Sequence, residues 1–206
     1  MKILGIDPGS RATGYALLEI GRARVRFLEA GVLSIPRDEG LGARLAAVGE
    51  GLEMILDRCR PDESAVEDVF HALNAKSALK LAHARGVILC VLARRTIPTA
   101  TYTPLQVKKA VSGYGFARKD ALRALLERLL EIPGSALTDD ASDAVAVALC
   151  HAQAIPLRDA VRAAEGRSSR ERGDASGKRA APGGPTARPS TRRARGAAGR
   201  QRIPEP

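Results

Sequence analysis

Aromatic side chains are scarce in this chain. Phe, Trp and Tyr together make up 3% of its 206 residues, and Trp is absent. Hydrophobic residues of all kinds still account for 45% of the chain, which is enough to build a core. That core must therefore be largely aliphatic.

Cysteine and histidine are also few and widely spaced. The cysteines are odd in number and form no CxxC pair, which favours small core side chains in a reducing compartment over a disulfide framework: Cys59, Cys90 and Cys150. The histidines lack zinc-finger or HExxH spacing, so we expect surface or hydrogen-bonded side chains rather than zinc ligands: His71, His83 and His151.

Long apolar runs are missing as well. The first apolar stretch ends at Asp7, which is too early for a signal peptide, and no stretch approaches the roughly 20 residues of a membrane span. The chain also lacks a Walker loop, a GxSxG elbow and a Cys and His signature of nucleophilic catalysis. We therefore expect a cytoplasmic protein with no membrane partner.

Positive charge is concentrated near the C-terminus. The net charge is +10, and residues 166–206 hold 11 of the 33 Lys and Arg residues but 3 of the 23 Asp and Glu residues. Few apolar residues occur there, which predicts disorder. We expect a folded domain at residues 1–155 and a basic tail at residues 156–206. The tail would either attract polyanions without reading their sequence, or have no function, since an Arg-rich composition can reflect coding bias alone.

The order of apolar patterns predicts an α/β domain. Strands are expected at residues 3–6, 13–20, 24–35, 64–70 and 99–103, the second and third of them joined in a hairpin. Helices are expected at residues 38–59, 75–95, 104–111, 119–132 and 139–154, with Asp38 and Thr138 as N-caps of the first and last. This order implies a mixed five-stranded sheet with helices on its faces.

An acidic residue follows the first predicted strand directly. Asp7 stands in GIDPGS, after an apolar run and before a Pro-Gly turn. An unpaired carboxylate at this place is costly inside a fold. Two interpretations are open: Asp7 caps the turn, or it binds a metal ion together with carboxylates from elsewhere in the chain.

Candidate partners for this carboxylate occur in two further segments. Glu67 and Asp68 lie in the strand-like run AVEDVF, where alternation points them to opposite faces of the sheet. Asp139 and Asp140 lie in the first turn of the last predicted helix, where the helix dipole favours acids. Asp143 follows three residues after Asp140 on the same helix face and precedes an apolar run. An acidic pair at the start of a buried helix calls for a cation.

Magnesium is the cation that such residues favour. It prefers oxygen ligands, binds through a few carboxylates and leaves positions for phosphate oxygens. Two such ions, roughly 3.5 to 4 Å apart, activate a water on one side of a phosphodiester and stabilise the departing oxygen on the other. The acids therefore indicate phosphodiester chemistry if they converge.

Four motifs occur in order along residues 1–155: GIDPGSRATGY, AVEDVF followed by NAKSALKLAHARG, QVKKAVSGYG, and DDASDAVAVALCH. Together they resemble the RuvC family of Holliday junction resolvases, bacterial endonucleases with a ribonuclease-H-like fold. The resemblance implies two Mg²⁺ ions, for which Mn²⁺ can substitute, and four ligands: Asp7, Glu67, Asp140 and Asp143. Asp68 and Asp139 are then their solvated neighbours.

The resemblance also implies a DNA-binding surface. Lys108 and Lys119 match basic positions that the family uses near the scissile phosphate, although by themselves they read as ordinary solvated lysines. Phe70 matches an aromatic residue that stacks on bases opened at the crossover, although by itself it reads as a core residue. Many relatives carry a lysine where Leu73 stands, so contact with DNA by this loop is expected to be weaker here.

The implied activity is the resolution of four-way DNA junctions in recombination and repair. The family acts as a homodimer that cuts two strands of like polarity and leaves ends that a ligase can seal. It works with the RuvA and RuvB branch-migration proteins.

Three alternatives remain open from the sequence. The GIDPGS opening also resembles the phosphate loop of actin-like and hexokinase-like ATPases, but residues 156–206 are too few for their second lobe. A RuvC-like nuclease family proposed for ribosomal RNA maturation shares the opening motif. A junction-binding protein without catalysis is the third alternative, and the complete set of four acids argues against it.

Overall fold

The computed structural model describes residues 1–176, apart from residues 10, 22–23, 37, 69–74, 114, 116–117 and 134–136. The chain divides into two compact units, Met1–Ala163 and Ala164–Pro206. All five strands and the predicted site residues belong to the first unit. Among the described residues, no helix combines the length and the apolar character needed to span a membrane.

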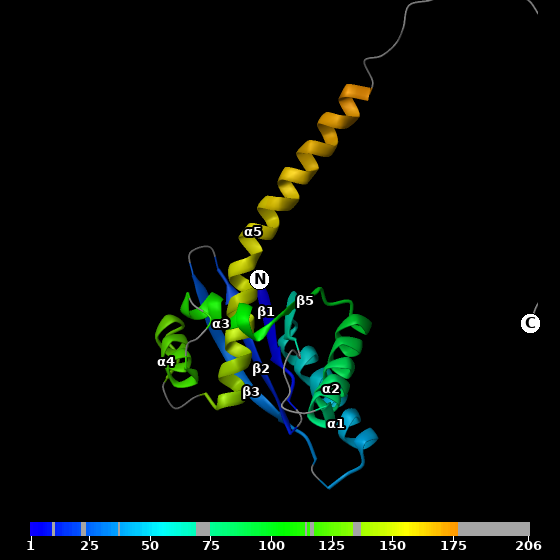
Figure 1. The fold of residues 1–206 in the computed structure, drawn as a ribbon, viewed down its shortest axis with the longest axis vertical. Helices are drawn as coiled ribbons and strands as arrows, with labels where there is room; N and C mark the ends of the chain where they lie inside the picture. Colours follow the sequence, from blue (N-terminus) through cyan, green and yellow to red (C-terminus); the bar gives the residue numbers. More distant parts are fainter. Residues whose placement is uncertain are drawn as a thin grey trace, which may run out of the picture. The chain divides into compact units, whose positions relative to one another are not determined.

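A mixed five-stranded sheet forms the centre of the first unit (Figure 1). Its order is β3-β2-β1-β4-β5, with bounds Val25–Ser34, Ala12–Ile20, Lys2–Asp7, Glu63–Glu67 and Thr99–Tyr102. The first three strands pair antiparallel, whereas β4 and β5 run parallel to β1. The prediction of a mixed five-stranded sheet is therefore confirmed.

Helices cover both faces of this sheet (Figure 1). One face packs against α1 (Leu41–Cys59) and α2 (Ala75–Arg94), whose apolar residues meet Leu4, Ile6 and Val66. The other face packs against α3 (Pro104–Ser112), α4 (Lys119–Leu129) and the first part of α5 (Asp139–Ser176), which meet Ile3 and Ala65. Neighbouring residues of β1 and β4 thus point into opposite cores, as strand alternation requires.

The helix boundaries depart from the predictions by three residues or more at three places, one of which is the end of α4 at Leu129 instead of residue 132. The predicted N-cap at Asp38 is wrong, because α1 begins at Leu41 after Gly40, which makes no side-chain cap hydrogen bond. The predicted end of the last helix at residue 154 is also wrong, because α5 continues through Pro156 to Ser176. The helix therefore runs into the segment for which we predict a tail, whereas residues 177–206 lie outside the described part. The Thr138 cap is confirmed, since Ala141 N donates to Thr138 Oγ1 at 3.3 Å.

A buried histidine links α5 to β4 and β5. The His151 ring is 4% exposed, with Nε2 2.9 Å from Glu63 Oε2 and Nδ1 2.8 Å from Tyr102 Oη. Because a carboxylate only accepts, Nε2 carries the proton and Nδ1 accepts from the Tyr102 hydroxyl. Arg158 donates two hydrogen bonds to Glu63, at 2.6 and 3.0 Å. These contacts hold a neutral imidazole, and its burial lowers the pKa of His151 despite the neighbouring carboxylate.

We predict that this histidine makes the fold less stable in acid. Above its ordinary pKa of 6.5 His151 is neutral in both states, and below it the unfolded chain takes up a proton that the folded chain resists. The free energy of unfolding should fall as the pH drops from 7.5 to 5.5, with this residue adding a slope of at most about 1.4 kcal/mol per pH unit. Urea unfolding at several pH values, compared with His151→Gln, measures this slope. Parallel profiles for the two proteins would contradict it.

Candidate active site

Asp7 and Glu67 occupy matching positions on adjacent strands. Asp7 ends β1 and Glu67 ends β4, each one residue beyond the paired residues Ile6 and Val66 of these parallel strands. Alternation places both carboxylates on the face that carries Ile3 and is covered by α5. The parallel pairing of two strands therefore brings together two acids that are 60 residues apart in the sequence.

Two glycines allow the start of α5 to approach these strands closely. A Cβ on Gly5 would stand 2.6 Å from Ala148 N and 2.7 Å from Ala148 Cβ. A Cβ on Gly14, which pairs with Asp7 in the sheet, would overlap the carbonyl oxygen of Asp140 and stand 2.7 Å from its carbonyl carbon. The backbone of Asp140 therefore packs directly against the strand residue beside Asp7.

The carboxyl groups of Asp7 and Glu67 lie close enough to act on each other directly, which favours a proton on Asp7. Burial, followed by the negative charge of Glu67, raises the pKa of Asp7 to about 9, and Asp143 and Asp140 add to this shift. Burial also raises the pKa of Glu67, against the effect of Lys119 and Lys108. Asp7 is thus under the influence of the other three predicted acids, and its surroundings disfavour its negative charge without a cation.

The acids of α5 differ in their contacts. Asp143 accepts a hydrogen bond from Lys119 Nζ at 2.8 Å, and its side chain is 26% exposed. Asp140 is exposed at the start of the helix. Asp139 is 82% exposed and lies 3.1 Å from Arg123 Nη1, away from the other acids. Asp139 is therefore a solvated neighbour, as the family resemblance implies.

The two predicted DNA-contacting lysines lie beside this acidic cluster. Lys119 opens α4, and its ion pair with Asp143, together with Asp7 and Asp139, raises the pKa of its ammonium group. Lys108 lies on α3 and acts electrostatically on Glu67. Thr103 and Gln106 form a capping box that fixes the start of α3. Two ammonium groups are thus held next to four carboxylates.

The acids are close but not arranged around a single point. No three of the described His, Cys, Asp or Glu side chains form a group that could hold a metal ion as they stand. The pair of Lys119 with Asp143 contributes to this, because it turns the Asp143 carboxylate toward an ammonium group. Phe70 and Leu73 lie outside the described residues.

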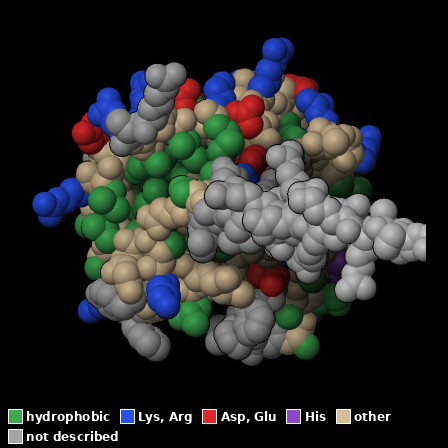
Figure 2. Space-filling view, turned by 90° about the horizontal axis from the view of Figure 1, so that it is seen from above, with side chains coloured by type: hydrophobic (Ala, Val, Ile, Leu, Met, Phe, Trp, Pro, Cys, Tyr) green, Lys and Arg blue, Asp and Glu red, His purple; other side chains and the backbone are tan. Residues whose placement is uncertain are grey.

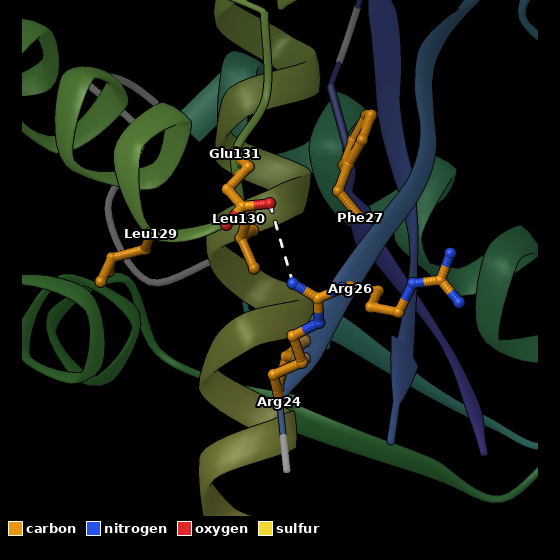
Figure 3. A pocket seen from close by; sticks show the side chains of 7 residues that line it. Arg24, Arg26, Phe27, Leu129, Leu130 and Glu131 are labelled. Atoms are coloured by element: carbon orange, nitrogen blue, oxygen red, sulfur yellow. Dashed lines mark ion pairs between the residues drawn. The ribbon is translucent and has the colours of Figure 1, made fainter. Parts of the chain in front are cut away.

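None of the hollows described below is lined by Asp7, Glu67, Asp140 or Asp143. One of about 280 Å³ lies between the start of β3 and the end of α4 and includes the exposed pair of Arg24 and Glu131, 3.8 Å apart (Figure 3). This hollow lies near the beginning of β1, because Ile20, at the end of β2 that leads into the hairpin, donates its N–H to Met1 O. Asp7 lies at the other end of β1. Acidic and basic side chains are interspersed on the face drawn in Figure 2. The acids at the strand ends are therefore the candidate site.

Sequence analysis missed the role of Gly5 and Gly14. Both lie inside strands, where glycine is disfavoured unless another backbone approaches closely, and this signal was available from the sequence. It also missed the pair of Lys119 with Asp143, because that contact joins α4 to α5 across 24 residues. No local pattern predicts such a contact.

A mixed sheet with paired carboxylates at the ends of two parallel strands defines a class, the ribonuclease-H-like nucleases. Within this class, residues 3–151 match the family model described as crossover junction endodeoxyribonuclease RuvC. The chain therefore belongs to the RuvC family.

Individual relatives agree with this assignment. The chain is 43% identical over 162 residues to the crossover junction endodeoxyribonuclease RuvC of Geobacter sulfurreducens, covering 79% of this chain and 98% of the relative. It is 45% identical over 153 residues to that of Desulforamulus reducens, covering 74% and 94%. The structure of Thermus thermophilus RuvC with a Holliday junction substrate matches with a TM-score of 0.69 and 29% identity, covering 74% of this chain and 93% of that one. The resemblance stated from the motifs is confirmed.

We predict that Gly14→Ala separates the acids without removing any of them. The added methyl group meets a backbone carbonyl that cannot rotate away, so the start of α5 must shift from β2. Such overpacking costs about 1 to 3 kcal/mol of unfolding free energy. Gly42→Ala on α1 is the matched control, since a Cβ there meets nothing within 4 Å. Thermal unfolding of both variants, with an assay of junction cleavage, tests this; a fully active Gly14→Ala protein would contradict it.

Proposed function

We propose that this protein is a metal-dependent endonuclease that resolves four-way DNA junctions in recombination and repair. The observation that carries the proposal is the meeting of Asp7, Glu67 and the start of α5 at one edge of the sheet, in a chain that belongs to the RuvC family. Four carboxylates beside two lysines suit a phosphodiester substrate. The negative charge of the phosphate attracts the lysines, and cations are required for the phosphate to approach the acids.

Divalent cations fit this set of side chains. The donors are all carboxylate oxygens, and a cation would offset the burial and the neighbouring negative charge that raise the pKa of Asp7. Asp7, Glu67, Asp140 and Asp143 would hold Mg²⁺ ions, two of them by resemblance to the family, and Mn²⁺ could substitute. The ions would supply an activated water and stabilise the leaving oxygen.

The lysines have separate roles in this proposal. Lys119 pairs with Asp143 in this structure, and it would be free to contact a phosphate if Asp143 held a cation instead. Lys108 lies near Glu67 and can bind a second phosphate oxygen. Phe70 would stack on an opened base, as the family resemblance implies.

A second copy of the chain completes the proposed enzyme. α2 buries Ile88 and Leu92 in the core, while Leu79 is 59% exposed and Ala82 and Gly86 are also exposed. This stripe of small and apolar residues permits close approach of another helix. We propose a homodimer through this face, whose twofold symmetry would match paired cuts in a four-way junction.

The remaining partners follow from the family alone. Cooperation with RuvA and RuvB branch-migration proteins is part of the proposal by resemblance. The relatives and the solved structure named above are described as junction endonucleases, so the alternative of an RNA maturation nuclease gains no support from them.

We predict that amide replacements of the acids abolish cleavage and leave junction binding intact. Asp7→Asn, Glu67→Gln, Asp140→Asn and Asp143→Asn keep the side-chain shape and remove the charge that holds the cations. Cleavage of a four-way junction should fall by several orders of magnitude, whereas binding without Mg²⁺ should be equal or tighter, because the empty acids repel phosphate. The control is Glu50→Gln, an exposed acid on α1. If one of the four variants cuts junctions at the normal rate, the residue replaced in that variant is not a metal ligand.

We predict that a charge on the exposed stripe of α2 separates the dimer. Leu79→Glu places a carboxylate on the apolar face, so light scattering at micromolar concentration should report a monomer where the unchanged chain is a dimer. Leu129→Glu on α4 is the control, since Leu129 is 53% exposed outside this face. A dimer that survives Leu79→Glu, or an unchanged chain that is monomeric and fully active, would overturn the proposed assembly.

A further inference from the structure

One side chain of α2 reaches the ends of two strands. Arg85 is 21% exposed, and its Nε donates to the backbone carbonyl oxygen of Glu67 at 3.3 Å. Its Nη2 donates to Thr101 Oγ1 at 3.3 Å and lies 3.3 Å from Asp68 Oδ1. A single guanidinium group therefore contacts the last residue of β4, the residue after it, and β5.

We infer that Arg85 is a positioning residue for Glu67, which fixes the end of β4 so that the Glu67 carboxylate faces Asp7 and α5. The inference deepens the proposed function and rests on it, because it concerns the metal site proposed there. Arg85 lies on the α2 side of the sheet, so it acts through the backbone of Glu67.

The end of β4 needs such a contact because the sheet ladder stops there. Glu67 is the last residue of the strand, and beyond it Asp68 N donates to Tyr102 O at 2.8 Å. Arg85 Nε donates to the carbonyl oxygen of the same peptide group, the one that joins Glu67 to Asp68. Both polar atoms of this peptide group are thus held, which restricts the backbone that carries the Glu67 side chain.

The same guanidinium group separates two neighbouring acids. Alternation sends Asp68 toward α2, where Arg85 holds it, while Glu67 points toward α5. Asp68 is therefore kept from competing with Glu67 for a cation. An exposed ion pair contributes little by charge alone, so the effect depends on the fixed geometry of the guanidinium donors. A lysine cannot reproduce these three contacts from one ammonium group.

The test measures cation binding without DNA. Mn²⁺ is titrated into the full chain and free Mn²⁺ is followed by electron paramagnetic resonance. We expect Arg85→Gln to weaken Mn²⁺ binding on the order of 10-fold, as for other residues that hold metal ligands in place, and Arg85→Lys to fall between it and the unchanged chain. Asp68→Asn, which retains an oxygen acceptor for Arg85, and Arg94→Gln, an exposed arginine of the same helix, should bind Mn²⁺ as the unchanged chain does.

A double-mutant cycle separates positioning from general stability. If Arg85 acts through Glu67, Arg85→Gln should weaken Mn²⁺ binding in the unchanged chain and have no further effect in a Glu67→Gln background. Additive losses in the two backgrounds would show a merely structural role and overturn the inference. If Arg85→Gln does not fold, Arg85→Lys decides: normal Mn²⁺ affinity in the folded Lys variant overturns the inference, and weakened affinity supports it. An unchanged chain that binds no Mn²⁺ would instead refute the proposed function.

Discussion

The direct packing of α5 against β1 and β2 is the constraint on which the site depends. Gly5 and Gly14 leave no side chain between the strands and the helix, so the backbones of Ala148 and Asp140 lie where a Cβ would otherwise stand. Because β1 and β4 end at the same edge of the sheet, this contact places the first turn of α5 beside Asp7 and Glu67. The apolar residues that follow Asp143 on the helix bury its continuation in the core and keep it there.

This packing forces like charges together, and the structure shows how the protein accommodates them. Burial and the charge of Glu67 raise the pKa of Asp7 to about 9, which favours its protonated form, and Lys119 pairs with Asp143. In the proposed enzyme, a cation would displace the proton of Asp7 and release the lysine. The same cluster would then be stable when empty and able to bind cations near a phosphate, whereas a set of unpaired buried carboxylates would destabilise the fold.

The sequence predicts those features that depend on local patterns. The order of strands and helices, the Thr138 cap and the opposite directions of Glu67 and Asp68 follow from periodicity, capping chemistry and alternation. The start of α1 and the end of α5 were mispredicted, because Asp38 is a good cap that the helix does not use and Pro156 does not end the last helix. The contacts of Lys119 and Arg85 join separate elements, and only the folded chain shows them.

α2 takes part in both the proposed metal site and the proposed interface between two chains. Its buried side packs in the core and sends Arg85 to the backbone of Glu67, while its exposed stripe carries Leu79 and Ala82. A hollow lined by Asp68, Arg85 and residues of that stripe lies between the two features. The surface through which we propose that two chains pair is therefore less than three helical turns from Arg85, which contacts the end of β4. Pairing of the helices would confine α2 and, through Arg85, the end of β4, so the same helix can orient two sites relative to each other and stabilise each of them.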